Sequence, residues 1–307
     1  MPNVRLVFMG TPEFAVPSLE MLLTHHYDVA AVVTAPDKPQ GRGKKVLPSP
    51  VKVAALAHHL PVLQPTNLKD PSFLATLQSY QADLQVVVAF RMLPQVVWAM
   101  PELGTFNLHA SLLPAYRGAA PINWAIINGE QETGVTTFFL EQAMDTGHIL
   151  FQEKEPIFGQ FTAGTWYKRL QHNGAHLVLK TVQAIEEGSY TATPQAPAPE
   201  SLSKKAPKIH KEDCRINWAQ KAISILNFIR GLSPYPAAWT ILNGKTYKIL
   251  SAEKAQEKLP LLSPGEVYTD KHAVWVGTQD YSIAIKVLQL AGKKPMAVQE
   301  FLRGHQI

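Results

Sequence analysis

Residues 106–118 read Phe-Asn-Leu-His-Ala-Ser-Leu-Leu-Pro-Ala-Tyr-Arg-Gly, and the rest of the chain is organised around them. The run ending at His109 predicts a strand, in which Asn107 and His109 project from the same face at the C-terminal end. In open α/β sheets, ligands bind outside the carboxyl ends of the strands. An amide donor and a titratable ring at this edge can reach one reacting carbonyl group.

The spacing alone leaves an alternative open, because Asn and His at a strand end often only form hydrogen bonds within a turn. A third polar residue favours catalysis. Asp145 follows an alternating apolar run over residues 135–140 and lies in a glycine-bounded turn. A carboxylate near His109 would orient the imidazole and stabilise its protonated form. Taken by itself, the Asp-Thr-Gly sequence at 145–147 is also that of a plain turn.

These residues together resemble the folate-dependent formyltransferases. The resemblance rests on Asn-x-His, then Ser-Leu-Leu-Pro with Arg-Gly after it, then a distal Asp-x-Gly. It extends to Gly-Thr-Pro-Glu-Phe-Ala at 10–15, Gly-Arg-Gly-Lys-Lys at 41–45 and Ile-Arg-Gly-Leu-Ser-Pro at 229–234, which look like the tRNA-specific member of the family. One departure is the family's Tyr-Gly-x-Ile-Leu-Pro, which is the shorter Phe-Arg-Met-Leu-Pro at residues 90–94.

The resemblance implies transfer of a formyl group from the co-substrate 10-formyltetrahydrofolate to the α-amino group of initiator methionyl-tRNA, without a metal. The amide of Asn107 and a protonated His109 would stabilise charge on the formyl oxygen, and Asp145 would hold the imidazolium. His109 or Asp145 would also move protons from the amine to the folate. The residues implied to line the folate site are Phe90, Arg91, Met92, Leu93, Ser111, Leu112, Leu113 and Pro114.

A long basic insertion follows the second predicted strand, over residues 35–50. An ordinary connection of this kind has about two to six residues, so the extra length needs a reason. We expect a mobile arm that carries Arg42, Lys44 and Lys45 to phosphates, and the resemblance implies that the acceptor end of a tRNA binds there. The alternative is a solvated loop without a partner.

The pattern of apolar runs predicts an α/β fold with a Rossmann-like, doubly wound, mostly parallel sheet. The first turn lacks Gly-x-Gly-x-x-Gly, so nicotinamide chemistry is not indicated. The strands are expected over residues 4–9, 28–34, 62–64, 83–89, 105–109, 134–140 and 149–158. The helices are expected over residues 14–24, 51–58, 71–78, 121–127 and 163–187.

The length of 307 residues favours two domains. We expect a catalytic domain over 1–190, a proline-rich linker over 191–206, and a tRNA-binding domain over 207–307. The last of these is expected to be a small β-barrel, similar to an OB-fold. Its expected elements are a helix over 221–230 that ends at Gly231, a hairpin over 238–249 with a type I′ turn at Asn-Gly, strands over 266–276 and 281–290, and a helix over 297–303.

The net charge of +5 is unevenly distributed. Residues 1–190 carry −2, whereas residues 207–307 carry +6. A basic second domain beside a nearly neutral first one suggests that the second binds a polyanion while the first carries out the chemistry. A surplus of this size is also compatible with an ordinary solvated surface.

Several classes of protein are disfavoured by composition. The single Cys214 excludes an intramolecular disulfide and a cysteine-rich metal site. No secretory signal and no apolar span of about 20 residues occur, so we expect a cytoplasmic protein without membrane contact. No obligate protein partner is evident, and we expect a monomer. Two rivals stay open: a related enzyme that formylates a nucleotide, an amino sugar or water, and an RNA-binding protein with a degenerate enzyme core. The basic insertion disfavours the amino-sugar enzyme, which has no need of it.

Overall fold

A computed structural model describes residues 4–40, 45–195, 204–255, 262–305 and 307. The chain divides into two compact units. The first unit comprises residues 1–117, 134–155 and 167–204, and the second comprises residues 118–133, 156–166 and 205–307. The second unit therefore takes two stretches from the middle of the chain. The expected domain boundaries after residues 190 and 206 stay a prediction.

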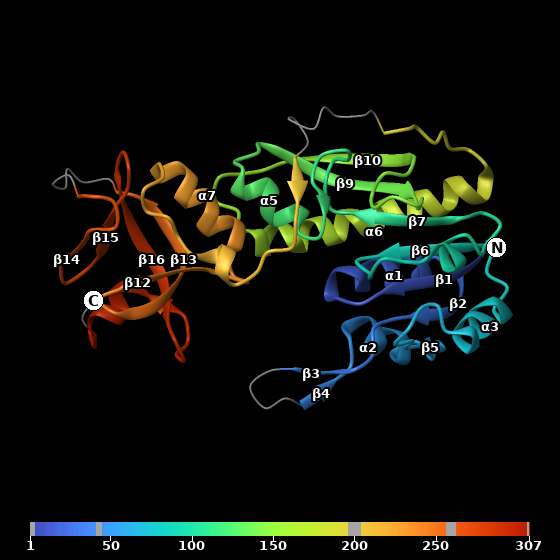
Figure 1. The fold of residues 1–307 in the computed structure, drawn as a ribbon. Helices are drawn as coiled ribbons and strands as arrows, with labels where there is room; N and C mark the ends of the chain where they lie inside the picture. Colours follow the sequence, from blue (N-terminus) through green and yellow to red (C-terminus); the bar gives the residue numbers. More distant parts are fainter. Residues whose placement is uncertain (1–3, 41–44, 196–203, 256–261, 306) are drawn as a thin grey trace. The chain divides into compact units, whose positions relative to one another are not determined.

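The first unit is built on a seven-stranded sheet with the order β10-β9-β7-β6-β1-β2-β5 (Figure 1). Its parallel pairs are β1 with β2, β1 with β6, β2 with β5 and β6 with β7, whereas β9 runs antiparallel to β7. The prediction of a doubly wound, mostly parallel sheet is confirmed. The strands are β1 (Arg5–Gly10), β2 (Asp28–Val33), β5 (Val62–Leu63), β6 (Leu84–Val88), β7 (Thr105–His109), β9 (Glu132–Phe139) and β10 (Ile149–Pro156).

Two helices of the first unit begin at a residue whose side chain caps the helix. The side chain of Ser49 accepts a hydrogen bond from the amide of Lys52, and Asp70 caps the next helix in the same way. Both caps precede a proline at the first helical position, where no amide hydrogen is needed. The helices are η1 (Glu13–Ala15), α1 (Val16–Thr24), α2 (Pro50–Ala57), α3 (Pro71–Ser79), α4 (Gln95–Trp98) and α6 (Ala163–Glu187). The single helix expected over 14–24 is instead a 3-10 turn followed by α1.

Strand β1 is buried on both faces, as its continuous apolar sequence predicts. Val7 and Met9 belong to a cluster that includes Phe73 of α3 and Val97 of α4. Leu6, Phe8 and their neighbours on the other face are also fully buried. A strand in this position cannot slip by one residue without losing its packing, which fixes the register of the sheet.

The second unit contains a curled antiparallel sheet with the order β12-β13-β16-β15-β14, and β17 pairs with β16. The expected small, OB-fold-like β-barrel is confirmed in the form of a half-barrel. The remaining elements are short or helical. The bounds are β8 (Arg117–Gly118), α5 (Pro121–Ile127), β11 (Lys205–Ala206), η3 (Glu212–Cys214), α7 (Ala222–Leu232), β12 (Ala238–Leu242), β13 (Lys245–Lys254), β14 (Val267–Thr269), β15 (Val274–Gly277), β16 (Ser282–Leu290), β17 (Met296–Ala297) and α8 (Val298–Leu302).

Two turns in this sheet differ in how closely they follow the sequence pattern. Asn243 and Gly244 both have positive φ, at 43° and 74°, which confirms the type I′ hairpin. The single strand expected over 266–276 is wrong, because β14 and β15 form an antiparallel pair around a turn. Asp270 closes that turn by accepting hydrogen bonds from the amides of His272 and Ala273. An aspartate at a turn can replace backbone partners in this way.

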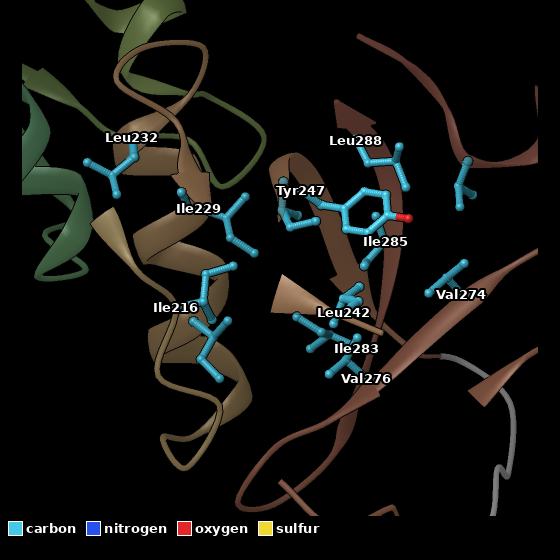
Figure 2. Packing of buried hydrophobic residues seen from close by; sticks show 14 of the residues in the cluster. Ile216, Ile229, Leu232, Leu242, Tyr247, Val274, Val276, Ile283, Ile285 and Leu288 are labelled. Atoms are coloured by element: carbon cyan, nitrogen blue, oxygen red, sulfur yellow. The ribbon is translucent and has the colours of Figure 1, made fainter. Parts of the chain in front are cut away.

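The core of the second unit lies between α7 and the sheet. Figure 2 shows Ile229 of α7 and Tyr247 of β13 within the same cluster of buried side chains. Cys214 belongs to this cluster, with 1% of its surface exposed, and its Sγ donates to the carbonyl oxygen of His210. Burial raises the pKa of this thiol. In the described part of the chain, no helix is long and apolar enough to cross a membrane.

Arg230 of α7 fastens the segment 158–161 to the helix. Its guanidinium donates to the carbonyl oxygen of Gly159 at 2.7 Å and to that of Phe161 at 3.3 Å. It also donates to Oδ1 of Asn227 at 2.7 Å. Burial lowers the pKa of the guanidinium. An arginine in this place stays charged, because its ordinary pKa lies far above neutral pH.

Helix α7 does not end at Gly231 as predicted, but continues through Leu232. Gly231 is needed for packing rather than for termination. A Cβ at this position would lie 2.5 Å from Cγ1 of Ile127 and 3.0 Å from the carbonyl oxygen of Asn123, both in α5. The helix ends instead where Ser233 is extended, as expected of a residue that precedes proline.

We predict that Gly231→Ala lowers the free energy of unfolding by about 1–3 kcal/mol, because the added methyl group overpacks the contact with α5. In a helix without such a contact, the same change would stabilise the protein. Urea denaturation followed by circular dichroism measures the effect. Gly304→Ala is the matched control, since nothing lies within 4 Å of its Cβ position. Equal stability of the Gly231 variant and the native chain would contradict this packing argument.

Candidate active site

Asn107 and His109 lie on one face of β7, as their spacing predicts. Asn107 is opposite Val87 of β6 and Phe138 of β9, and His109 is opposite Thr136 of β9. The side chain of Asn107 is half-buried, whereas His109 is 6% exposed. Both side chains are therefore held by a strand with neighbours on each side, which restricts their positions more than a loop would.

The imidazole of His109 is oriented by a backbone group. Its Nε2 lies 2.9 Å from the carbonyl oxygen of Tyr116. A carbonyl oxygen can only accept, so Nε2 carries the hydrogen, and Nδ1 is the nitrogen left for other partners. Tyr116 has a positive φ of 61°, which is uncommon for a residue with a side chain. Sequence reasoning missed this contact, because a backbone carbonyl has no residue signature.

The loop after β7 is held by a buried hydroxyl group from the neighbouring strand. Oγ1 of Thr136 donates to the carbonyl oxygen of Ser111 at 2.6 Å and accepts from the amide of Leu113 at 3.2 Å. Nε2 of Gln152 in β10 donates to the same hydroxyl at 3.0 Å and to the carbonyl oxygen of Leu113 at 2.8 Å. Neither Thr136 nor Gln152 lies in a motif that would mark it, from sequence, as part of the candidate site.

Asp145 lies in the turn between β9 and β10, with a φ of 54°. Gly147 is required there, because a Cβ would lie 1.7 Å from the carbonyl oxygen of Phe139. Strand β9 ends at Phe139, which is paired with Phe106. The turn therefore starts at the N-terminal end of β7, whereas His109 is at its C-terminal end.

Gln195 joins this turn to the loop after β7. Its Nε2 donates to the carbonyl oxygens of Asp145 at 2.9 Å and Gly147 at 2.8 Å. Its Oε1 accepts from Nε of Arg117 at 3.1 Å and also from Nη2. Two residues earlier, Thr193 forms a β-bridge with Ile149. Sequence reasoning assigned this segment to the linker, because its prolines mask the contacts that it makes.

The residues expected to line the folate site differ in exposure. Ser111, Leu113 and Leu93 are buried, so neither their side chains nor their backbone groups present much surface to a ligand in this structure. Oγ of Ser111 already donates a hydrogen bond to the carbonyl oxygen of Ala115 at 2.7 Å. The expected residues with exposed or half-buried side chains are Phe90, Arg91, Met92, Leu112 and Pro114.

Arg91 binds backbone groups in the segment that follows β5. Its guanidinium donates to the carbonyl oxygen of Thr66 at 2.9 Å and to that of Pro65. It also lies 5.7 Å from the centre of the Phe90 ring. A glycine could make none of these contacts, so the loop after β6 is fixed here by a side chain. In the described residues, no three His, Cys, Asp or Glu side chains gather as a metal site requires.

Comparison with known proteins identifies the family. Residues 4–182 match a family described as formyl transferase, and residues 208–306 match its C-terminal domain. The chain belongs to the formyl transferase family. Methionyl-tRNA formyltransferase of Bacteroides fragilis is 50% identical over 99% of this chain and 96% of its own length. The enzymes of the same name from Azobacteroides pseudotrichonymphae and Syntrophus aciditrophicus are 52% and 46% identical, over 99% and 100% of this chain and 96% and 98% of their own.

Solved structures are also similar to this chain in fold. HypX from Aquifex aeolicus in complex with tetrahydrofolic acid has a TM-score of 0.66 at 21% identity, over 98% of this chain and 48% of that one. An N-formyltransferase from Helicobacter canadensis, in complex with folinic acid and dTDP-3-aminofucose, has a TM-score of 0.67 at 22% identity, over 92% of this chain and 98% of that one. At these identities the likeness concerns the fold.

The insertion before α2 contains a short hairpin, formed by β3 (Lys38–Gln40) and β4 (Lys45–Leu47). Arg42 and Lys44 lie outside the described residues, and Lys45 is described only as part of β4. The base of the hairpin is fixed by Lys52, whose Nζ donates to Asp37 and to Gln64, each at 2.7 Å. The hydrogen bond from Lys52 lowers the pKa of the Asp37 carboxyl group.

We predict that Thr136→Val lowers the free energy of unfolding by about 1–3 kcal/mol, the cost of leaving buried polar groups without a partner. Valine has nearly the same shape as threonine, but the amide of Leu113 and the carbonyl of Ser111 would lose their shared hydroxyl. Urea denaturation measures the change. Thr191→Val, at an exposed position, is the control and should alter stability little. A stability equal to that of the native chain would show that the hydroxyl does not hold the loop.

Proposed function

We propose that this member of the formyl transferase family transfers a formyl group from 10-formyltetrahydrofolate to the α-amino group of initiator methionyl-tRNA. The product would be N-formylmethionyl-tRNA, used for translation initiation. The observation that carries the proposal is the amide and imidazole pair, Asn107 and His109, at the end of β7. The named relatives, at about half identity and over nearly the whole chain, support this choice of acceptor over a sugar or a nucleotide.

The reaction forms a bond between the amine nitrogen and the formyl carbon and breaks the bond from that carbon to N10 of the folate. Negative charge develops on the formyl oxygen before the second bond breaks. We assign its stabilisation to the side-chain amide of Asn107 and to the protonated ring of His109. Because Nε2 of His109 is committed to Tyr116, the ring nitrogen that donates to the formyl oxygen would be Nδ1.

Asp145 contributes its negative charge in this proposal. A carboxylate close to His109 favours the imidazolium form, since opposite charges stabilise each other. The amine must lose a proton as it becomes an amide, and N10 of the folate must gain one as its bond to carbon breaks. His109 or Asp145, directly or through water, would carry this proton between the two nitrogens.

The remaining parts of the chain would hold the two substrates. Backbone and side chains after β6 and β7 would line the folate site, including Phe90–Leu93 and Ser111–Pro114. Arg42, Lys44 and Lys45 would contact phosphates near the acceptor end of the tRNA. The positive charge of residues 207–307 supports binding of the tRNA helix through its phosphates. The protein would act as a monomer in the cytoplasm.

The direct test measures formylmethionine after incubation with 10-formyltetrahydrofolate and charged initiator tRNA. We predict that Asn107→Ala lowers kcat by about 10²–10³-fold, the usual cost of removing one oxyanion donor. His109→Ala and Asp145→Ala should also lower kcat strongly. His172→Ala, an exposed histidine of α6, is the matched control. Near-native rates in any of the three variants, with unchanged circular dichroism, would remove that residue from the mechanism.

We predict that Arg42→Ala raises KM for the tRNA and leaves folate binding unchanged. KM should rise because one phosphate contact is lost, and the loss should also weaken the salt dependence of tRNA binding. Steady-state kinetics at several salt concentrations and folate titration measure the two effects separately. Lys69→Ala, which removes an exposed cation outside the insertion, is the control. An equal loss of folate affinity in the Arg42 variant would contradict the assignment of the arm to tRNA.

A further inference from the structure

The strand register poses a problem for the proposed site. His109 is paired with Thr136 near the start of the β7–β9 ladder, whereas β9 leaves that ladder at Phe139, opposite Phe106. Strands advance about 3.3 Å per residue, so the turn that carries Asp145 starts about 10 Å from His109 along the sheet. A turn that extended straight on from β9 would carry Asp145 farther away. The turn must fold back if Asp145 is to act with His109.

Gln195 makes the contacts that such a fold requires. Its Nε2 donates both of its hydrogens, one to the carbonyl oxygen of Asp145 and one to that of Gly147. Its Oε1 accepts from the guanidinium of Arg117, which follows the loop after His109. One half-buried amide group thus joins the Asp-Thr-Gly motif to the Arg-Gly motif, although these lie in separate segments of the sequence.

We propose that Gln195 is a positioning residue, which holds the Asp145 turn over the sheet by linking it to Arg117. This inference rests on the proposed function, because Asp145 matters only if formyl transfer occurs at this site. Gln195 does not touch the reacting atoms in the proposal. It acts through the backbone on either side of Asp145, and so restricts where the carboxylate can lie.

Glutamine is the side chain that these partners require. Two carbonyl oxygens need two donors, and a guanidinium needs an acceptor, which together are the groups of an amide. Glutamate would keep the acceptor for Arg117 but would place a carboxylate against two carbonyl oxygens. Methionine has a similar length and would keep neither kind of hydrogen bond. Both substitutions therefore remove the donors to the Asp145 turn, and only glutamate keeps the acceptor for Arg117.

The backbone that carries Gln195 is itself held in place. The amide of Thr193 donates to the carbonyl oxygen of Ile149 at 2.8 Å, and the amide of Ile149 donates back at 2.8 Å. This bridge lies at the start of β10, directly after the turn. The backbone two residues before Gln195 is thus bonded to the strand that follows the turn, while the Gln195 side chain is bonded to the turn itself.

The test combines kinetics with hydrogen exchange in the full chain. In Gln195→Met and Gln195→Glu, we expect kcat to fall by about 10- to 100-fold, the usual effect of a small misplacement of a catalytic group. KM for folate and for tRNA should change less than about threefold, since uniform binding is not removed. Amides of residues 141–148 should exchange faster in both variants, as measured by mass spectrometry. Gln78→Met, at an exposed glutamine of α3, is the control and should change neither quantity.

A double-mutant cycle distinguishes positioning from general destabilisation. If Gln195 acts through Asp145, Gln195→Met should lower kcat less than about threefold in an Asp145→Ala background. A full additional loss in that background would overturn the proposal, as would unchanged exchange of residues 141–148 in the single variants. Absence of formyl transfer by the native chain would instead contradict the proposed function, while the exchange measurement would still test the link.

Discussion

The antiparallel pairing of β7 with β9 is the constraint on which the rest of the site depends. It places Thr136 beside His109, where the threonine hydroxyl can hold the loop after β7. It also fixes where β9 ends, and therefore where the turn with Asp145 begins. The parallel pairing of β7 with β6 adds the second boundary, since it brings the loop at residues 89–94 to the same edge of the sheet. The register of the strands thus determines which side chains and loops can meet in the site.

Much of the fold follows from patterns that act over short distances. The buried strand at 84–88, the helix at 121–127 and the helix at 163–187 are predicted nearly to the residue, because the local pattern of apolar residues specifies them. Gly231 shows where this reasoning stops. A glycine near the end of a helix usually indicates termination, but here the packing of α5 against α7 is the reason for it. That contact joins segments about a hundred residues apart, which no local pattern records.

In the candidate site, too, some residues can be predicted from sequence and others cannot. Asn107, His109 and Asp145 are polar groups in recognisable motifs, so the sequence can nominate them. The groups that hold them are mostly backbone carbonyls, such as that of Tyr116 at His109 and those of Asp145 and Gly147 at Gln195. Every residue has a carbonyl, so its role is set by the path of the chain. Gln195 could not be predicted for a further reason, since a proline-rich stretch indicates a linker between domains and not a segment that packs against one of them.

The buried thiol of Cys214 has a practical consequence for spectroscopy. Only the thiolate reacts readily with alkylating dyes, and this sulfur is both enclosed and held in its protonated form near neutral pH. Because it is the single cysteine of the chain, a second one introduced at an exposed position would be the preferred point of attachment for a fluorophore. The native background is therefore suited to site-directed labelling without prior removal of a cysteine.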